Sequence, residues 1–443
     1  MENNTEVVKL YHSPLTPHAS PLFKALPPLA LYIHIPWCVK KCPYCDFNSH
    51  EIRPQATEQN AAPEAESWKS PRPCSRPGAS HAESRGHFNS HEARGEVPEK
   101  QYVAALIADL ESALPQIWGR KIHSVFFGGG TPSVFSAESL DAILAAVRAR
   151  VNLDAYAEIT LEANPGTFET EKFAAFRAAG INRLSIGIQS FNPRHLKALG
   201  RIHDDKEARR AIEIAQRHFD NFNLDLMYAL PGQTLEEARA DIETALSFAP
   251  PHISAYHLTL EPNTLFHRYP PPLPDDELSA QMQEMIEDTL AAKGYTHYET
   301  SAFARKNLEC RHNLNYWRFG DYLGIGAGAH SKISFPEKII RQMRYKQPQE
   351  YLALAPEHKS INNQHIVSTS ELGFEFMMNA LRLIEGFPVS LFEERTGVPI
   401  SAVQKELNAA EQKSLITRDH QRIAPTLRGQ RFLNDLLQIF LPD

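Results

Sequence analysis

The chain has 443 residues, of which 42% are hydrophobic and 22% are charged, and its net charge is -7. This length favours one large domain with a smaller second unit, and the acidic balance argues against a general nucleic-acid-binding protein. No stretch approaches the roughly 20 apolar residues of a membrane span, and the N-terminus lacks the apolar core of a signal peptide, so we expect a cytoplasmic protein.

Residues 1–29 are a proline-rich N-terminal segment without an evident catalytic group. The first predicted strand, 31–35, leads into a loop that carries Cys38, Cys42 and Cys45 in a C-x-x-x-C-x-x-C spacing. Three thiolates can ligate three irons of a four-iron cluster and leave the fourth iron open to another ligand. A closed zinc site needs a fourth ligand, and three neighbouring thiols cannot all pair as disulfides. The spacing therefore favours an iron–sulfur cluster.

A long insertion follows the cysteine loop. The sequence Phe-Asn-Ser-His-Glu at 47–51 recurs at 88–92, and removing one copy with the intervening segment leaves the motif in continuous register. That segment holds only Ile52 and Trp68 as large apolar side chains, a composition that cannot repay the entropy of folding. We expect residues 52–92 to be a disordered insertion that arose by local duplication. A lid over the cysteine loop is the alternative for so long a loop.

Strand-like and helix-like patterns alternate along the large domain. The alternation predicts a parallel α/β fold, and six units are too few to close an eight-stranded barrel. We expect an open, partial (β/α)6 barrel over residues 30–300 and an extension of it over 301–365. The predicted strands are 31–35, 122–127, 156–161, 182–187, 222–227 and 252–258, and the predicted helices lie near 98–115, 136–150, 168–180, 205–218, 234–248 and 276–293.

Glycines and polar side chains end or interrupt the later strands, at the edge where parallel α/β folds bind ligands. Glycines allow backbone amides to approach a ligand, and the planar fork of an arginine suits a carboxylate. An unpaired carboxylate inside an apolar strand is costly. The repetition of such residues, more than any single one, predicts a polar site at this edge. The set comprises Gly128, Gly129, Gly130, Thr131, Glu162, Gln189, Arg201 and Asp225.

The sequence changes character near residue 366, where helical patterns surround a two-stranded turn. We expect a mostly helical, winged-helix-like domain over 366–443. The recognition-helix position, 400–412, carries Glu406 and Glu411 against Lys405, with Lys413 just after it, so it lacks the basic face of a DNA-binding helix. A last predicted helix has an apolar stripe that packs into a core or docks on a partner or membrane surface. The stripe comprises Leu427, Phe432, Leu436, Leu437 and Phe440.

The first strand with Tyr32, the cysteine loop and Tyr44 resembles the radical S-adenosylmethionine superfamily. In that family S-adenosylmethionine chelates the open iron of a 4Fe-4S cluster, and an electron from the cluster can cleave its sulfonium bond. The later motifs are similar to those of oxygen-independent coproporphyrinogen dehydrogenases and their haem-chaperone relatives, over nearly all the chain except the N-terminal segment and the insertion. The resemblance implies that Cys38, Cys42 and Cys45 hold the cluster and that Tyr32, Tyr44, Gly129, Gly130, Thr131, Glu162, Gln189, Arg201 and Asp225 line the S-adenosylmethionine site.

Two departures from the dehydrogenases favour the haem-chaperone group. The dehydrogenases continue the cluster motif with a further cysteine where this chain has Phe47, and the motif HNLNYW at 312–317 resembles the haem-associated motif of the chaperones. By this resemblance His312 and Tyr316 bind haem, and both residue types serve as haem ligands. The glycines of GIGAGAH, 324–330, either let a flat macrocycle approach the backbone or begin a tight helix.

The resemblance therefore implies a haem chaperone that carries a 4Fe-4S cluster, S-adenosylmethionine and haem. It would transfer haem to apo-haemoproteins such as respiratory haem enzymes. The alternative is a coproporphyrinogen III dehydrogenase that acts through a deoxyadenosyl radical. A homodimer and peripheral membrane contact stay open, and no nucleic-acid partner is expected.

Overall fold

The computed structural model describes residues 23–52, 97–167 and 170–442. Nearly all of the expected disordered insertion, and the N-terminal segment up to residue 22, lie outside the described residues. Within the part of the chain that is described, no helix is long and apolar enough to cross a membrane.

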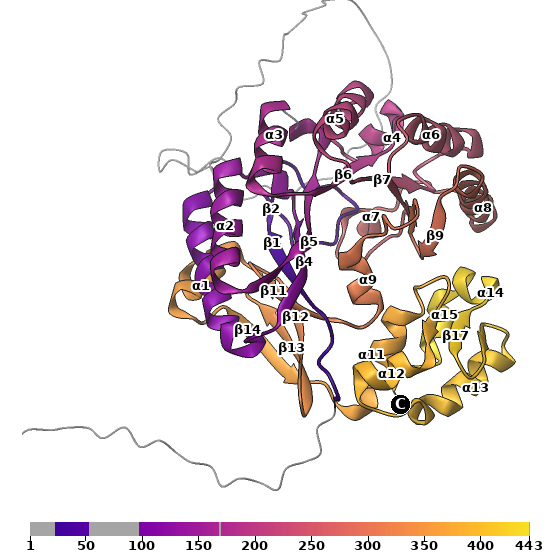
Figure 1. Ribbon diagram of the computed structural model, residues 1–443. Helices are drawn as coiled ribbons and strands as arrows, with labels where there is room; N and C mark the ends of the chain where they lie inside the picture. The colour runs from indigo at the N-terminus through magenta and orange to yellow at the C-terminus, as the bar shows by residue number, and fades with distance from the viewer. Residues whose placement is uncertain (1–22, 53–96, 168–169, 443) are drawn as a thin grey trace, which may run out of the picture.

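Six parallel strands form the centre of a 12-stranded sheet, and they are neighbours in the order in which they occur along the chain. Figure 1 shows these strands curving through the molecule, with helices on their outer side. The six predicted strands and the open partial barrel are confirmed. The strands are β1 (Leu29–Ile35), β4 (Lys121–Gly129), β5 (Asn152–Ala163), β6 (Arg183–Gln189), β7 (Phe222–Tyr228) and β8 (His252–His257).

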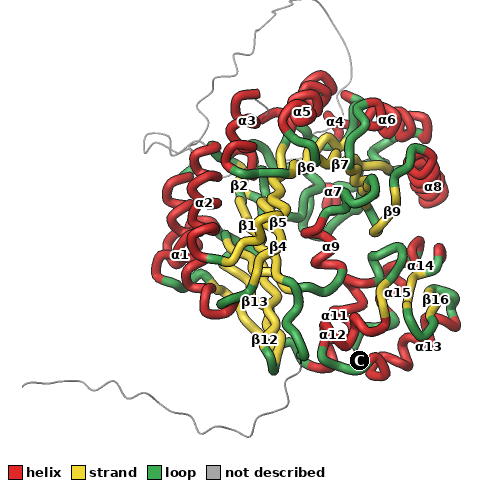
Figure 2. The backbone as a smooth tube through the Cα atoms, in the orientation of Figure 1, coloured by secondary structure: helices red, strands yellow, loops and turns green. Residues whose placement is uncertain are grey.

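The six predicted helices are also confirmed, and Figure 2 shows them outside the sheet. Local sequence explains where two of them start, because Asp204 with Glu207, and Thr234 with Glu237, form capping boxes that satisfy free amides of the first turn. Their apolar faces bury isoleucines and alanines against the strands. The helices are α1 (Glu99–Ile117), α2 (Ala137–Arg150), α3 (Thr170–Ala179), α5 (Asp205–His218), α6 (Leu235–Ser247) and α8 (Asp276–Ala292).

The sheet extends beyond the six strands at both edges, which the sequence patterns did not predict in detail. β11 pairs parallel to β1 and is followed by three antiparallel strands, while β10 and β9 pair antiparallel beyond β8. Of the two alternatives for GIGAGAH, the helix start is wrong, because its glycines lie in β11 and in the turn to β12. The added strands are β9 (Thr296–Glu299), β10 (Ala302–Ala304), β11 (Asp321–Ile325), β12 (His330–Phe335), β13 (Lys338–Arg344) and β14 (Ile361–Ile366).

Several short elements join these parts. Two-residue strands pair in the cysteine loop, and single-turn helices follow β6 and β8. α9 carries the HNLNYW motif and lies between the sheet and the C-terminal helices in Figure 1. These elements are β2 (Trp37–Cys38), β3 (His50–Glu51), α4 (Pro193–Ala198), α7 (Leu265–Arg268), α9 (Arg311–Trp317) and α10 (Pro348–Leu354).

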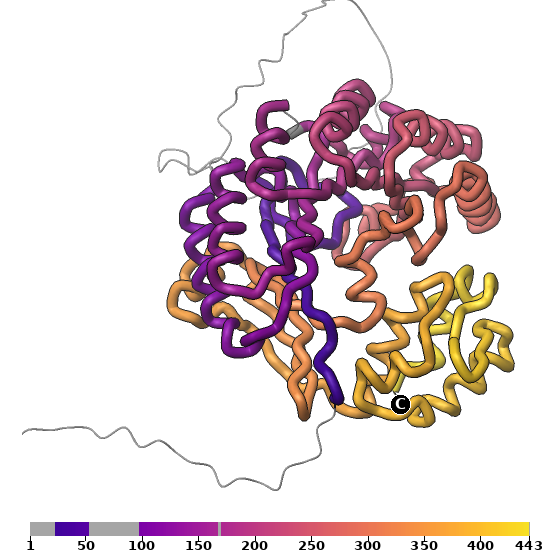
Figure 3. Tube along the Cα trace, in the orientation of Figure 1, coloured from indigo at the N-terminus to yellow at the C-terminus, as the bar shows by residue number. Residues whose placement is uncertain are grey.

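The C-terminal part has its own apolar core and a small sheet. The sheet has three strands where two were predicted, because β15 pairs with β17. An ion pair of 2.6 Å between Arg431 and Glu287 joins this part to α8, and Figure 3 shows it beside the barrel. Its elements are α11 (Thr369–Ala380), β15 (Phe387–Pro388), α12 (Val389–Thr396), α13 (Gln404–Gln412), β16 (Ile416–Arg418), β17 (Arg422–Pro425), α14 (Leu427–Arg431) and α15 (Leu433–Gln438).

The single apolar stripe predicted for the last helix is wrong. The helix breaks at Phe432, which separates α14 from α15 and turns the two segments in different directions. Leu436 and Phe440 are buried, whereas Leu427 is 63% exposed and Phe432 is 55% exposed. Only the second half of the stripe therefore packs in the core.

Candidate functional site

The three cysteines lie on the loop that leaves β1, and none of them forms a disulfide. The pairing of Trp37 with His50 closes the loop on itself. Burial raises the pKa of the Cys38 thiol to about 11 and also raises that of Cys45. A bound metal reverses such an effect, because a coordinating thiol is deprotonated outright.

Each thiol has a polar neighbour. Thr131 Oγ1 donates to Cys38 Sγ at 3.5 Å, and Arg201 Nη1 donates to Cys42 Sγ at 3.7 Å. Cys45 Sγ lies 3.8 Å from Ser49 Oγ. Donors beside a sulfur stabilise its thiolate form and tune any metal that it ligates. Among the described residues, no three His, Cys, Asp or Glu side chains converge as a single-ion site does.

A cavity of about 440 Å³ opens beside the loop, and we call it the outer cavity. Its walls come from the cysteine loop and from the carboxyl ends of β4 to β8, which is the edge predicted for ligands. Eleven of the fourteen residues predicted to bind a metal or cofactor meet in it: Cys38, Cys42, Tyr44, Cys45, Gly129, Gly130, Thr131, Glu162, Gln189, Arg201 and Asp225.

The glycine run is needed for a reason different from the predicted one. The amide of Gly129 donates to Glu162 Oε2 at 3.2 Å, and the amides of Gly130 and Thr131 donate to the carbonyls of Ile35 and Trp37 at 2.8 Å each. These amides are therefore engaged within the protein. The absent side chains allow close packing instead, because a Cβ on Gly130 would lie 2.5 Å from the carbonyl oxygen of Trp37.

GIGAGAH also packs against the cysteine loop. Gly328 has φ +80°, and a Cβ there would lie 2.2 Å from Asn48 Nδ2. That same nitrogen donates to the carbonyl of Ala327 at 3.0 Å. Gly328 thus packs against the cysteine loop, and the backbone at this glycine faces protein and not a flat ligand.

The loop after β6 places two more residues at the outer cavity. Gln189 ends the strand with φ 67°, and Arg201 follows α4 and donates from Nη2 to the carbonyl of Gly187 at 2.7 Å. Burial opposes the charge of Arg201, but the hydroxyl of Tyr44 and the thiol of Cys42 outweigh it and raise the pKa of the arginine. The guanidinium thus stays charged beside the cysteine loop.

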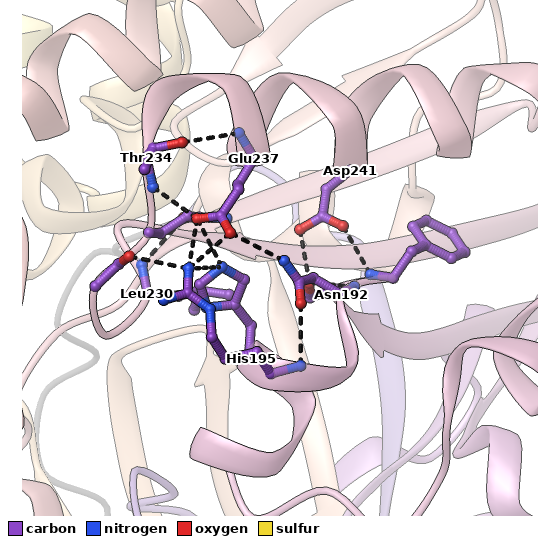
Figure 4. A network of polar contacts seen from close by, with 11 residues as sticks. Asn192, His195, Leu230, Thr234, Glu237 and Asp241 are labelled. Carbon is purple, nitrogen blue, oxygen red and sulfur yellow. Dashed lines mark hydrogen bonds and ion pairs between the residues drawn. The ribbon is translucent and has the colours of Figure 1, made fainter.

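A polar network fixes this loop, as Figure 4 shows. Asp241 of α6 accepts hydrogen bonds from the amide of Phe191 and the hydroxyl of Ser190, each at 2.7 Å. One turn earlier, Glu237 accepts from Arg194 at 2.6 Å and lies 3.3 Å from His195 Nε2. The network ties the start of α4 to α6, so that Arg201 emerges at a defined point of the outer cavity.

Glu162 and Asp225 are partly buried carboxyl groups at the wall of the outer cavity, close enough for their charges to interact. Burial and the charge of Asp225 raise the pKa of Glu162 to about 8, against one opposing hydrogen bond from Gly129. Burial also raises the pKa of Asp225, although Ser185 Oγ donates to its Oδ2 at 2.9 Å and Asn223 Nδ2 donates to its Oδ1 at 2.7 Å. A cation bound beside these groups would favour their ionised forms.

Replacing Glu162 with Gln is expected to stabilise the ligand-free protein at alkaline pH. The folded-state pKa of about 8 lies above the usual 4.5, so the folded protein keeps a proton that the unfolded chain loses, and stability falls as pH rises between these values. Glutamine removes this loss while its Oε1 can still accept from Gly129. We expect the melting temperature of the variant to exceed that of the wild type by at least about 2 °C at pH 8.5. The two melting temperatures should converge near pH 4.5. An equal difference at pH 4.5 and pH 8.5 would contradict the raised pKa of Glu162.

The remaining three predicted residues, Tyr32, His312 and Tyr316, line a second, deeper space of about 250 Å³, the inner cavity. The two cavities share walls at Phe47, Gly129 and Glu162, among others. The structure therefore places the residues of the haem-associated motif inside the barrel, next to the outer cavity, and not on the protein surface.

His312 is held from three sides. The amides of Arg311 and His312 donate to Glu158 at 3.2 and 3.1 Å, which anchors the first turn of α9 on β5. A hydrogen bond of 3.0 Å joins His312 Nδ1 to Ser124 Oγ, and the ring stacks on Phe126 at 4.9 Å. Its Nε2 has no hydrogen-bond partner. Burial and the nearby Arg183 lower the histidine pKa to about 3, so the ring is neutral.

Sequence reasoning missed the polar residues that line the inner cavity from within β6, β7 and β8. They recur at every second position of β6, β7 and β8, alternating with buried apolar residues. Period-two alternation is the signal of a strand with two different faces, and here the polar face points into the barrel. The residues that this signal identifies are Arg183, Ser185, Asn223, His252, Ser254 and Tyr256.

Known proteins resemble this chain in both of its parts, the barrel and the C-terminal domain. The sequence profile of the radical SAM superfamily matches residues 32–245, and that of the HemN C-terminal domain matches residues 367–432. The chain is 43% identical over 424 residues to "Heme chaperone HemW" of Haemophilus influenzae, covering 94% of this chain and 99% of that protein. It is 42% identical to the Escherichia coli protein of the same name, with the same shares covered.

More distant proteins match as well. "Heme chaperone HemW" of Bacillus subtilis is 30% identical over 418 residues, covering 93% of this chain and 98% of that protein. The solved structure of coproporphyrinogen III oxidase (HemN) from Escherichia coli, a radical SAM enzyme, superposes with a TM-score of 0.72 at 20% identity. The superposition covers 94% of this chain and 90% of the HemN chain, which shows that the two proteins share a fold.

Proposed function

Because the chain belongs to the family of HemW haem chaperones within the radical SAM superfamily, we propose that it binds haem and transfers it to apo-haemoproteins such as respiratory haem enzymes. We further propose that it carries a 4Fe-4S cluster and S-adenosylmethionine. One observation carries the proposal: three free thiols converge on one cavity with the polar side chains that suit S-adenosylmethionine, which are Glu162, Gln189, Arg201 and Asp225.

Cys38, Cys42 and Cys45 would hold the cluster. Their spacing leaves one iron without a protein ligand, and they lie at the wall of a cavity large enough for a small-molecule ligand. When bound, the cluster would supply that open iron and an electron. The neighbouring Thr131 and Arg201 support thiolate character at two of the sulfurs.

The other side chains of the outer cavity suit a ligand that bears both an ammonium and a carboxylate, as S-adenosylmethionine does. Glu162 and Asp225 offer carboxyl groups with raised pKa values, whose ionised forms a bound cation would favour. Arg201 presents a guanidinium for a carboxylate, and Gln189 adds a polar group beside it. Tyr44 closes the wall through its contact with Phe266, at 6.3 Å between ring centroids.

His312 and Tyr316 would bind haem. Histidine ligates iron as the neutral imidazole, and the lowered pKa of His312 keeps it neutral throughout the physiological range. Ser124 occupies Nδ1, which leaves Nε2 for a ligand. Tyr316 stands edge-on to this ring at 5.0 Å, so the two side chains meet at one wall of the inner cavity.

Haem transfer tests the proposal. The purified protein is reconstituted anaerobically with its cluster, loaded with haem and freed of excess haem. It is then mixed with apomyoglobin, whose absorbance reports haem that it acquires. We expect the acceptor spectrum to appear as the donor spectrum disappears. Stable retention of haem by the donor in the presence of excess acceptor would refute a role in transfer.

A further inference from the structure

Arg183 opens β6 and is the most deeply buried cation of the inner cavity, with 2% of its surface exposed. Among the described residues its guanidinium group makes no hydrogen bond or ion pair, and its Nε is buried without a partner. Burying a charged group that forms no hydrogen bond is strongly unfavourable. The N–H donors of Arg183 are therefore available to an anionic ligand.

The acidic groups near Arg183 are engaged elsewhere. Glu158 accepts hydrogen bonds from the amides of Arg311 and His312 at the start of α9. Asp225 accepts from Ser185 and Asn223. Both carboxyl groups lie close enough for their charges to raise the pKa of Arg183, yet neither forms an ion pair with it. The guanidinium therefore keeps its planar fork of N–H donors for a ligand.

Other groups on the same wall can join it. The side chain of Asn313 lines the inner cavity and makes no hydrogen bond with the described residues. Burial, and after it the charge of Arg183, lowers the pKa of His312 and of His252, so both rings are neutral beside this cation. The wall thus combines one fixed cation with neutral polar groups.

We propose that the inner cavity is a carboxylate-binding site in which Arg183 holds the anion and Asn313 contributes a second donor. The planar fork of arginine matches the two oxygens of a carboxylate. A single cation flanked by Glu162 and Asp225 on the same cavity suits one negative charge better than the two charges of a phosphate.

The shared walls of the two cavities allow the carboxylate to belong to a larger ligand that also occupies the outer cavity. A cavity of about 250 Å³ accommodates a propionate-sized arm. Only the naming of this arm as a haem propionate rests on the proposed function. A free small carboxylate is the other source of the same chemistry, and the experiment separates the two.

The test compares haem with its dimethyl ester, in which both propionates are masked, by absorbance titration of the cluster-loaded protein. The wild type should bind haem at least about tenfold more tightly than the ester, since a buried arginine–carboxylate pair is charge-assisted. Arg183→Met should lose this preference. Arg210→Met, which removes an exposed arginine from α5, should retain it and controls for the change in net charge.

Folding is checked in the same variants. Methionine is similar in length and carries no charge, so the melting temperature of ligand-free Arg183→Met should equal or exceed that of the wild type. In a second arm, sodium propionate should raise the melting temperature of the ligand-free wild type more than sodium chloride of equal ionic strength does. Arg183→Met should show no such difference.

The outcomes separate the site from the proposed function. A wild type that binds haem and its ester equally well would overturn the assignment of a propionate site while leaving haem binding intact. If neither form of haem binds, the proposed function fails, and propionate stabilisation that requires Arg183 would still support the carboxylate site. Propionate stabilisation that is absent, or that persists in Arg183→Met, would overturn it.

Discussion

Replacing any one of Cys38, Cys42 and Cys45 with serine is expected to abolish the cluster. The three thiols are the free cysteines of one loop at the outer cavity, and a serine hydroxyl does not replace a thiolate as an iron ligand. Bound iron should fall from about four atoms per chain to less than one after anaerobic reconstitution. The measurement is iron and sulfide content together with the visible absorbance of the cluster.

Cys310→Ser is the matched control for these variants. Cys310 is also a free thiol, but it is buried beside Glu158 at the start of α9, with its Sγ 3.6 Å from Glu158 Oε1. It does not line either cavity, so its loss should leave the iron content unchanged. Full iron content in a serine variant of the cysteine loop would remove that residue from the cluster.

Replacing His312 with alanine is expected to reduce haem affinity at least about tenfold without loss of the cluster, because an axial nitrogen ligand is lost while the cysteine loop is untouched. The side chain of His312, on α9, contacts Ser124, Phe126 and Tyr316, and its ring lies 6.4 Å from that of Tyr32. None of these residues lies in the cysteine loop. Absorbance titration with haem measures the affinity, and the iron–sulfur absorbance reports the cluster.

Phenylalanine at position 312 separates ligation from packing. The side chain of His312 is buried and stacks on Phe126 at 4.9 Å, so alanine also leaves a cavity that costs stability. Phenylalanine preserves an aromatic ring in this stack but has no nitrogen. If His312 ligates haem, both variants should lose affinity to a similar extent. Haem affinity that alanine lowers and phenylalanine restores would indicate a packing role only.

Much of the fold was predictable because the central strands and helices follow simple periodicities. β1 is a buried apolar run, and β4 to β8 each contribute buried apolar residues to the core. A helix follows each of β4 to β8 along the chain. The antiparallel extension was harder to predict, since β12 contains Lys332, a residue that usually marks an exposed face. In the structure that lysine is buried and pairs with Asp321 at 2.9 Å. The partner lies in another strand, and local sequence does not show such a pairing.

Some residues of the candidate site were likewise predictable from the sequence, and others were not. Residues at strand ends, such as Glu162 and Arg201, were predictable because that edge of a parallel sheet is where ligands bind. Arg183 was not, because it begins its strand and so lies at the opposite end from Gln189. Its significance appears only when α9 covers the barrel interior and every nearby carboxylate is found to have other partners. The glycines at 128–130 could be predicted to allow close packing. The sequence did not show whether a ligand or the protein's own backbone packs against them.

Parallel measurement of haem binding and of porphyrin chemistry tests the central claim most directly. The protein is reconstituted anaerobically with its cluster and S-adenosylmethionine, and one portion is titrated with haem while another is incubated with coproporphyrinogen III and a reductant. A haem chaperone should bind haem and form no protoporphyrinogen. Substantial protoporphyrinogen formation without haem uptake would contradict the account and establish a coproporphyrinogen dehydrogenase.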